Sequence, residues 1–207
     1  MITRPFSLAI LLLLVCAGCA PVPNMRGPKT LDERYENLLR DWTRSGQVFQ
    51  ALDLILVTHA TYLSPGFRQS FGEQYLQIFG IDPGRMDSDL EKIATSVGRG
   101  HEFFLFLDTT QTEWNNLDER DSVWRLGLWG GPNQPGVPPL SVQGFQGRGP
   151  NLRAFFPFLT RFGRPYLVVF PIDQPNGKPV LDPENGVLTL RLASALGTAS
   201  LTWKVPE

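Results

Sequence analysis

The sequence predicts an α+β fold, in which an antiparallel β-sandwich carries an N-terminal helix and two inserted helices. Three observations lead to this class. Short segments of the C-terminal half alternate apolar and polar residues with the period of half-buried strands. Turn residues, mainly Gly, Pro, Asn and Asp, separate these segments. Three segments of the N-terminal half instead place apolar residues at helical spacing behind a capping residue.

The first helix is expected to begin at Thr30 and to end at Gly46. Thr30 and Glu33 form a capping box, in which each side chain bonds a free backbone amide of the first turn. The apolar stripe of this helix consists of Leu31, Tyr35, Leu38, Leu39 and Trp42. Such a helix could lie on a membrane, but its acidic and basic residues balance, which favours packing against the domain.

A single long strand is expected over residues 48–63, and apolar residues on both of its faces indicate burial on both sides. Ser64 and Pro65 then open a helix that ends at Gly80, because serine caps a helix and proline fits its first position. A further helix is expected from Ser88 onward. These two helices are inserted between the first and second strands.

The remaining strands are expected at residues 103–107, 124–128, 140–145, 164–170, 188–192 and 201–205. Asn176-Gly177 and Asn185-Gly186 predict tight turns, because both residue types tolerate a positive φ. This half resembles an immunoglobulin-like sandwich in its architecture, without the Cys–Trp–Cys hallmark of that family. One domain is expected over residues 30–207.

The N-terminus combines Arg4, an apolar run over residues 10–15 and the sequence Ala17-Gly18-Cys19. This order is typical of a signal peptide, and the run is shorter than the roughly 20 residues that a membrane-spanning helix needs. The segment resembles the lipobox of bacterial lipoproteins, although Cys16 stands where that family more often has leucine.

The resemblance implies that residues 1–18 are a signal peptide and that Cys19 becomes a lipidated N-terminus; cleavage without lipidation is the alternative. Residues 19–29 are rich in proline and predict a tether of roughly 30 Å. The protein would then lie in the cell envelope, bound to the membrane through Cys19. Because Ala20 rather than aspartate follows the cysteine, the resemblance implies the outer membrane, facing the periplasm, if the organism is diderm.

Composition limits the partners and the chemistry. The formal net charge is -1, so no basic surface for nucleic acid is expected. With Cys16 removed and Cys19 lipidated, the folded part would contain no disulfide and no thiol nucleophile. The two histidines, His59 and His101, are too few for a typical zinc site without carboxylate help. We expect no metal, no cofactor and no catalytic residue, since a G-x-S-x-G motif is also lacking.

Two side-chain groups have alternative interpretations. Glu113, Asp118, Glu119 and Asp121 could supply the carboxylate pair of a glycoside hydrolase, but so dense a group favours a solvated loop. Phenylalanines 155, 156, 158 and 162 are expected in the core, in a turn or kinked strand; an exposed group would be a partner-binding patch.

The Gly- and Pro-rich segment 129–150 is the most suggestive for function, because loops on a rigid scaffold often carry recognition. Aromatic residues and arginines anchor interfaces. The candidate contact residues are Trp124, Trp129, Phe145, Arg148 and Arg153. We therefore expect a membrane-tethered, non-enzymatic component that binds or assembles with an envelope protein. The alternative is a binding protein for an envelope glycan or small ligand, with Trp124 and Trp129 as stacking platforms; a hydrolase is less favoured.

Overall fold

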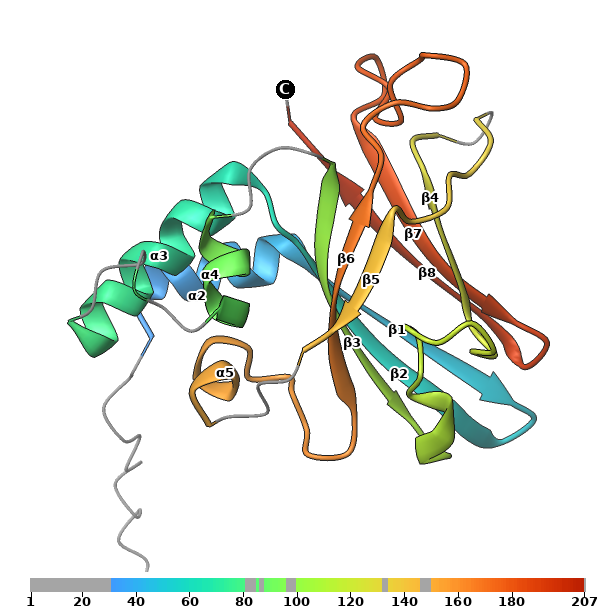
Figure 1. Cartoon of the computed structure of the whole chain (residues 1–207), viewed down its shortest axis with the longest axis horizontal. Coiled ribbons are helices and arrows are strands. Elements are labelled where there is room, and N and C mark those ends of the chain that lie inside the picture. The colour runs from blue at the N-terminus through green and yellow to red at the C-terminus, as the bar shows by residue number, and fades with distance from the viewer. Residues whose placement is uncertain are drawn as a thin grey trace, which may run out of the picture.

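The computed structural model describes residues 31–80, 85, 88–95, 100–131, 134–145 and 150–206. Its elements are α2 (Glu33–Trp42), β1 (Thr43–Gln50), β2 (Asp53–Tyr62), α3 (Pro65–Phe79), α4 (Ser88–Thr95), β3 (His101–Thr109), the 3-10 helix η3 (Thr112–Trp114), β4 (Arg125–Trp129), β5 (Ser141–Gly144), α5 (Pro150–Phe155), β6 (Arg164–Phe170), β7 (Val187–Ser194) and β8 (Gly197–Lys204). The strands form two antiparallel sheets, a five-stranded one in the order β1-β2-β3-β6-β5 and a three-stranded one in the order β4-β7-β8 (Figure 1). The predicted α+β class is confirmed, and the two sheets are compatible with a sandwich.

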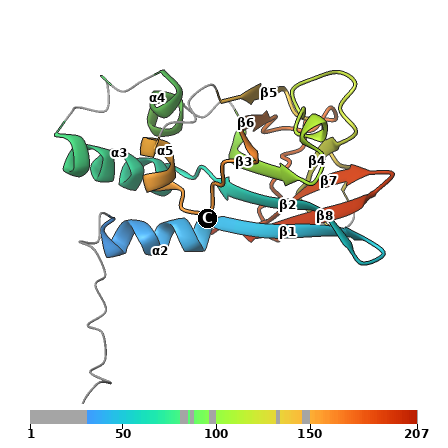
Figure 2. The ribbon, with the colours of Figure 1, turned by 90° about the horizontal axis from the view of Figure 1, so that it is seen from below.

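The five-stranded sheet has two buried faces, because its central strand β3 places apolar side chains on both. Phe103, Leu105 and Leu107 pack with the inner residues of the three-stranded sheet. Phe104 points the other way, into a second cluster that the helices supply. Figures 1 and 2 show these helices gathered at one end of the sheet. The alternation predicted for residues 103–107 is confirmed.

The first helix is shorter than predicted, because it ends at Trp42 and the chain runs directly into β1 (Figure 2). Gly46 does not stop the helix; it lies within β1, where the two sheets approach closely. A Cβ atom at Gly46 would lie 3.1 Å from Leu201 Cδ2 and 3.2 Å from Ala199 Cβ. Asp32 caps the helix by accepting a hydrogen bond from the Arg34 amide. Thr30, the predicted cap, lies outside the described residues.

The single strand predicted over residues 48–63 is wrong, because the chain turns at Ala51 and Leu52 and forms the β1–β2 hairpin. Tight hairpin turns require a positive φ and usually contain glycine or asparagine. Ala51 takes that conformation instead, with a φ of 54°. The turn therefore lacks its usual sequence signal.

Both inserted helices are confirmed. Ser64 caps α3, and Gly80 ends it in the left-handed conformation, with a φ of 64°. The helix α5 was not predicted, and it carries Phe155 into the helix-side cluster together with the following Phe156. The core location expected for Phe155 and Phe156 is confirmed, and α5 with the turn at residues 157–158 takes the place of a kinked strand. Phe162 is 67% exposed, so the core expectation is wrong for that residue. No helix in the described part of the chain is long and apolar enough to cross a membrane.

Candidate functional site

Two of the predicted contact residues are buried. Trp124 is only 1% exposed and belongs to the core between the sheets. Phe145 is 6% exposed and packs edge-to-face against Phe104 on the helix side, with ring centroids 5.3 Å apart. Neither ring offers a surface to a partner, which contradicts the expectation for both. They also lie on opposite faces of the five-stranded sheet and form no common site.

Trp129 is half-buried on the outer face of the three-stranded sheet. Its indole lies against Gly127 and Gly136, where a Cβ atom would overlap the ring. The guanidinium of Arg191 lies 5.2 Å from the centre of that ring, at cation–π distance. Arg153 is exposed on α5, on the helix side of the molecule. Arg148 and Cys19 lie outside the described residues.

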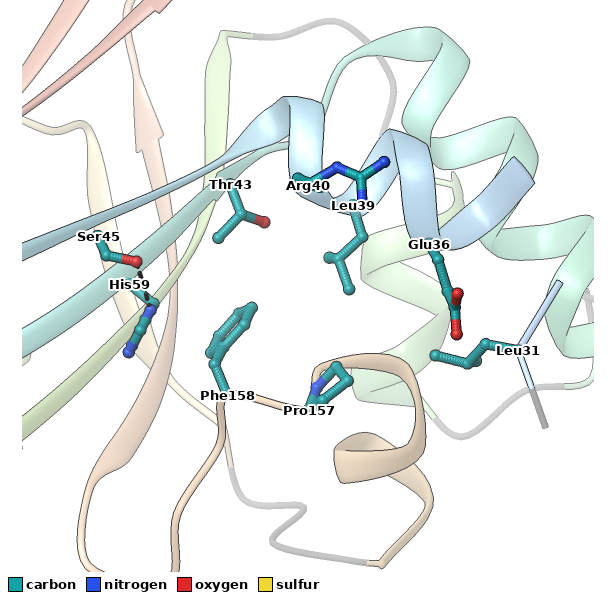
Figure 3. Close-up of a pocket in the computed structure, with 9 residues that line it drawn as sticks. All are labelled: Leu31, Glu36, Leu39, Arg40, Thr43, Ser45, His59, Pro157 and Phe158. Carbon is teal, nitrogen blue, oxygen red and sulfur yellow. Dashed lines mark hydrogen bonds between the residues drawn. The ribbon is translucent and has the colours of Figure 1, made fainter. Parts of the chain in front are cut away.

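A groove of about 490 Å³ opens where α2 meets the β1–β2 hairpin and the segment that follows α5. We call it the α2 groove. Its lining residues are Leu31, Glu36, Leu39, Arg40, Thr43, Ser45, His59, Pro157 and Phe158. Figure 3 shows Leu39 and Phe158 pointing into the same space from opposite walls.

The two ends of the α2 groove differ in polarity. Leu31, Leu39 and Pro157 give one part an apolar surface. At the other end Ser45 Oγ lies 2.8 Å from His59 Nδ1, and the two atoms share a hydrogen bond. Ser45 pairs directly with His59 across the hairpin, so both side chains project from the same face of the sheet.

The imidazole of His59 is held in place by stacking on Phe158, with ring centroids 4.9 Å apart and planes inclined by 18°. Burial lowers the pKa of His59, and the negative charge of Asp108 offsets part of this effect. The neutral imidazole is therefore favoured near pH 7. A neutral imidazole and a hydroxyl together offer one hydrogen-bond donor and one acceptor to a polar group at this end of the groove.

Charged groups line the groove at its α2 wall, where Glu36 and Arg40 carry opposite signs. Arg40 donates a hydrogen bond to Asn37 Oδ1. In the described ranges, no three His, Cys, Asp or Glu side chains come together closely enough to hold a metal ion. His101 does not line the groove; it begins β3, and its Nδ1 lies 3.2 Å from the hydroxyl of Tyr62.

Sequence reasoning missed this groove, because the pairing of Ser45 with His59 depends on the unrecognised hairpin turn at Ala51. The amphipathic stripe of the first helix was the one available signal, since Leu31 and Leu39 belong to it. In comparisons with known proteins, no family model, no curated protein and no solved structure matches the chain.

Proposed function

We propose that this protein is a membrane-tethered, non-enzymatic binding protein of the cell envelope, and that its α2 groove binds an amphiphile with an acyl-type chain. The observation that carries the proposal is an apolar groove that ends in the Ser45–His59 hydrogen bond. An apolar chain would lie along Leu31, Leu39 and Phe158. The polar head would bond the imidazole and the hydroxyl.

The size of the groove supports a small ligand, because ligand pockets commonly measure about 300–1,000 Å³. Its apolar walls also supply a driving force of roughly 25 cal/mol for each Å² of apolar surface that a chain buries. A fully polar ligand would gain little from these walls. An amphiphile satisfies both ends of the groove.

The place of the groove in the chain supports a ligand of membrane origin. Leu31 lines the groove and lies two residues after the end of the predicted tether, residues 19–29. A lipid on Cys19 would hold the groove within roughly 30 Å of the bilayer, where amphiphiles concentrate. A hydrolase is the less favoured proposal. The nearby acid, Asp108, accepts a hydrogen bond from Thr160 and shares none with His59 among the described residues, whereas a catalytic triad needs the acid to orient the imidazole.

Displacement of a fluorescent fatty acid tests the groove, with dodecanoate and a lysophospholipid as competitors and the full chain carrying Cys19→Ala as the protein. Ser45→Trp should fill the polar end and weaken binding by at least about tenfold. Gln47→Trp, two residues further along the same strand, adds the same ring outside the groove and should bind as the parent does. Equal affinity of both variants, or no binding by the parent, would exclude the groove as the site.

The anchor is tested separately by fractionation of cells that express the unmodified chain. Cys19→Ala should move the protein from the membrane fraction to the aqueous fraction, since stable anchoring needs the acyl chains. If the variant stays with the membranes, the lipid anchor is refuted.

A protein partner is the second candidate function, and the position of Trp129 and Arg191 favours it. Both lie on the outer face of the three-stranded sheet, where exposed Arg125, Thr198 and Thr202 surround them. Arginine and tryptophan are among the residues that most often anchor protein interfaces.

We also propose that the two sheets form a sandwich of the immunoglobulin-like type. Two antiparallel sheets support a sandwich but do not specify its type.

In-cell crosslinking followed by mass spectrometry tests this second function. One dominant envelope protein, crosslinked near Trp129 and lost with Trp129→Ala, is the expected result. The control is Phe49→Ala, which removes an aromatic side chain that is 56% exposed on β1. Capture that is the same in both variants would show that this face is not the interface.

A further inference from the structure

We propose that a second, polar cavity of this protein binds a pyranose ring of an envelope glycan. The cavity measures about 530 Å³ and shares no lining residue with the α2 groove. One wall is formed by η3 and residues 115–119, the other by Arg161, Phe162 and the first residue of β6, Arg164. The site is thus separate from the groove, although the envelope source of the glycan rests on the location given under the proposed function.

Two acceptor atoms in the lining lack a donor. The side-chain oxygens Oδ1 of Asn115 and Asn116 are buried, and neither accepts a hydrogen bond from any described residue. Asn115 as a whole is only 7% exposed. Buried acceptors are nearly always satisfied, because leaving one unpaired destabilises the protein. Both oxygens lie just beneath the surface of the cavity, so a turn of the side-chain amide is needed before a ligand hydroxyl can donate to either of them.

The wall that holds these asparagines is rigidly supported. The Tyr166 hydroxyl donates a hydrogen bond of 2.6 Å to the backbone oxygen of Asn115 and accepts one from the Leu117 amide at 3.2 Å. Asn115 Nδ2 in turn donates to the backbone oxygen of Phe162 at 3.3 Å, which links the two walls. A ligand would therefore meet a preorganised cavity, which lowers the entropic cost of binding.

The charges around the cavity favour a neutral polyhydroxyl ligand. Glu113 and Glu119 contribute carboxylates, while Arg161 and Arg164 contribute guanidinium groups. Sugar hydroxyls can donate to the former and accept from the latter. A divalent cation would be repelled by the arginines and an inorganic anion by the glutamates.

An aromatic ring at the rim distinguishes a sugar from other polar ligands. Phe162 is 67% exposed, and the Arg161 guanidinium lies 5.0 Å from the centre of its ring. The C–H face of a pyranose would pack on the free side of this ring while its hydroxyls reach the asparagines. The exposure of Phe162 alone would carry no meaning, but its place at the rim of a polar cavity gives a sugar both a ring to pack on and polar groups to bond.

NMR titration of the full chain carrying Cys19→Ala tests the proposal with two probes, chitotetraose for the N-acetylated amino sugars of a cell wall and maltotetraose for neutral hexoses. Saturable shifts of the Asn115 and Asn116 side-chain amides with either probe are expected, and the probe that binds identifies the source. Phe162→Ala should weaken binding by about tenfold. Phe49→Ala, at the exposed ring on β1, should leave it unchanged.

The fold of each variant is checked by its amide spectrum, so that loss of binding is not confused with unfolding. Asn116→Leu, which removes the acceptor oxygen with little change in size, serves as a second variant and should also weaken binding. Failure of both oligosaccharides to shift these amides would overturn the proposal. So would shifts caused by Ca²⁺ alone, or equal binding by Phe162→Ala and Phe49→Ala.

Discussion

The indole Nε1 of Trp203 donates a hydrogen bond of 2.7 Å to the backbone oxygen of Trp42. Trp42 is the last residue of α2, where backbone carbonyls lose their helical partners. Trp203 lies on β8 of the other sheet and is fully buried. The Trp203 side chain therefore satisfies the Trp42 carbonyl at the junction of α2 and β1. The same hydrogen bond links the end of α2 to the three-stranded sheet.

Trp203→Phe should lower the free energy of unfolding by about 1–3 kcal/mol, because it leaves the part-buried Trp42 carbonyl without this donor. Urea unfolding followed by circular dichroism measures the change. Trp129→Phe is the control, since that half-buried indole has no hydrogen bond of this kind among the described residues and should cost less. Equal losses would show that ring volume, not the hydrogen bond, decides the effect.

Close contact between the sheets at Gly46 leads to a second prediction. Gly46→Val should destabilise the fold by about 1–3 kcal/mol, because its side chain would overlap Leu201 and Ala199. Thermal unfolding gives the comparison. The matched control is Gln47→Val, the same residue type at the neighbouring exposed position of β1, which should change stability little. An unchanged melting temperature for Gly46→Val would mean that the sheets can separate at no cost.

Gly46 and Ala51 also show where sequence reasoning failed for the fold. The apolar periodicity of the first helix, of α3 and of strands β3 to β8 reflects the faces that they bury, so these elements could be predicted. A glycine can end a helix, and it can also allow two strands to pack closely. At Gly46 only the nearby strand β8 shows that the second role applies. Ala51 adopts a turn conformation that its residue type does not signal.

The candidate sites were harder to predict, because they depend on contacts between distant segments. Trp124 has the residue type of an interface anchor, but its strand turns it into the core. The dense carboxylates predict a solvated loop, and Glu113 and Glu119 are exposed, but nothing in the sequence signals the buried side-chain oxygen of their neighbour Asn115. Residue type indicates what a side chain can bind, while the fold decides whether it is accessible.

A buried ion pair connects α3 to β3 and α4. Arg68 Nη2 lies 2.6 Å from Glu102 Oε2, and Arg68 Nη1 donates to the backbone oxygens of Lys92 and Ile93 in the last turn of α4. Burial lowers the pKa of Arg68, whereas the charge of Glu102 raises it again. The guanidinium therefore stays charged and holds α4 on the sheet.

Arg68→Leu should destabilise the protein by about 3–5 kcal/mol, because it removes the guanidinium that pairs with the buried Glu102 carboxylate. Hydrogen exchange should then speed up first in α4, whose last carbonyls lose their donor. The double variant Arg68→Leu/Glu102→Leu should recover part of the loss, since it removes both buried charges. A double variant that is less stable than Arg68→Leu would show that Glu102 stabilises the fold by contacts other than this pair.

His101 predicts how stability depends on pH. Burial lowers its pKa, and the charge of Asp173 offsets only part of this effect. Its Nε2 is buried and has no hydrogen-bond partner among the described residues. A proton on that atom would place a charge inside the protein, so the folded state favours the neutral ring. The unfolded chain takes up the proton near pH 6.5.

His101 therefore contributes fully to the free energy of unfolding above about pH 6.5. This contribution is lost as the pH falls from there toward the lower pKa of the folded state. The limiting slope of stability against pH is about 1.4 kcal/mol per pH unit. Chemical unfolding of the parent and of His101→Gln between roughly pH 7.5 and 5.5 measures it. The variant should have the shallower dependence, because glutamine does not titrate. Parallel curves would mean that the folded protein protonates His101 as readily as the unfolded chain does, which requires the ring to reach water.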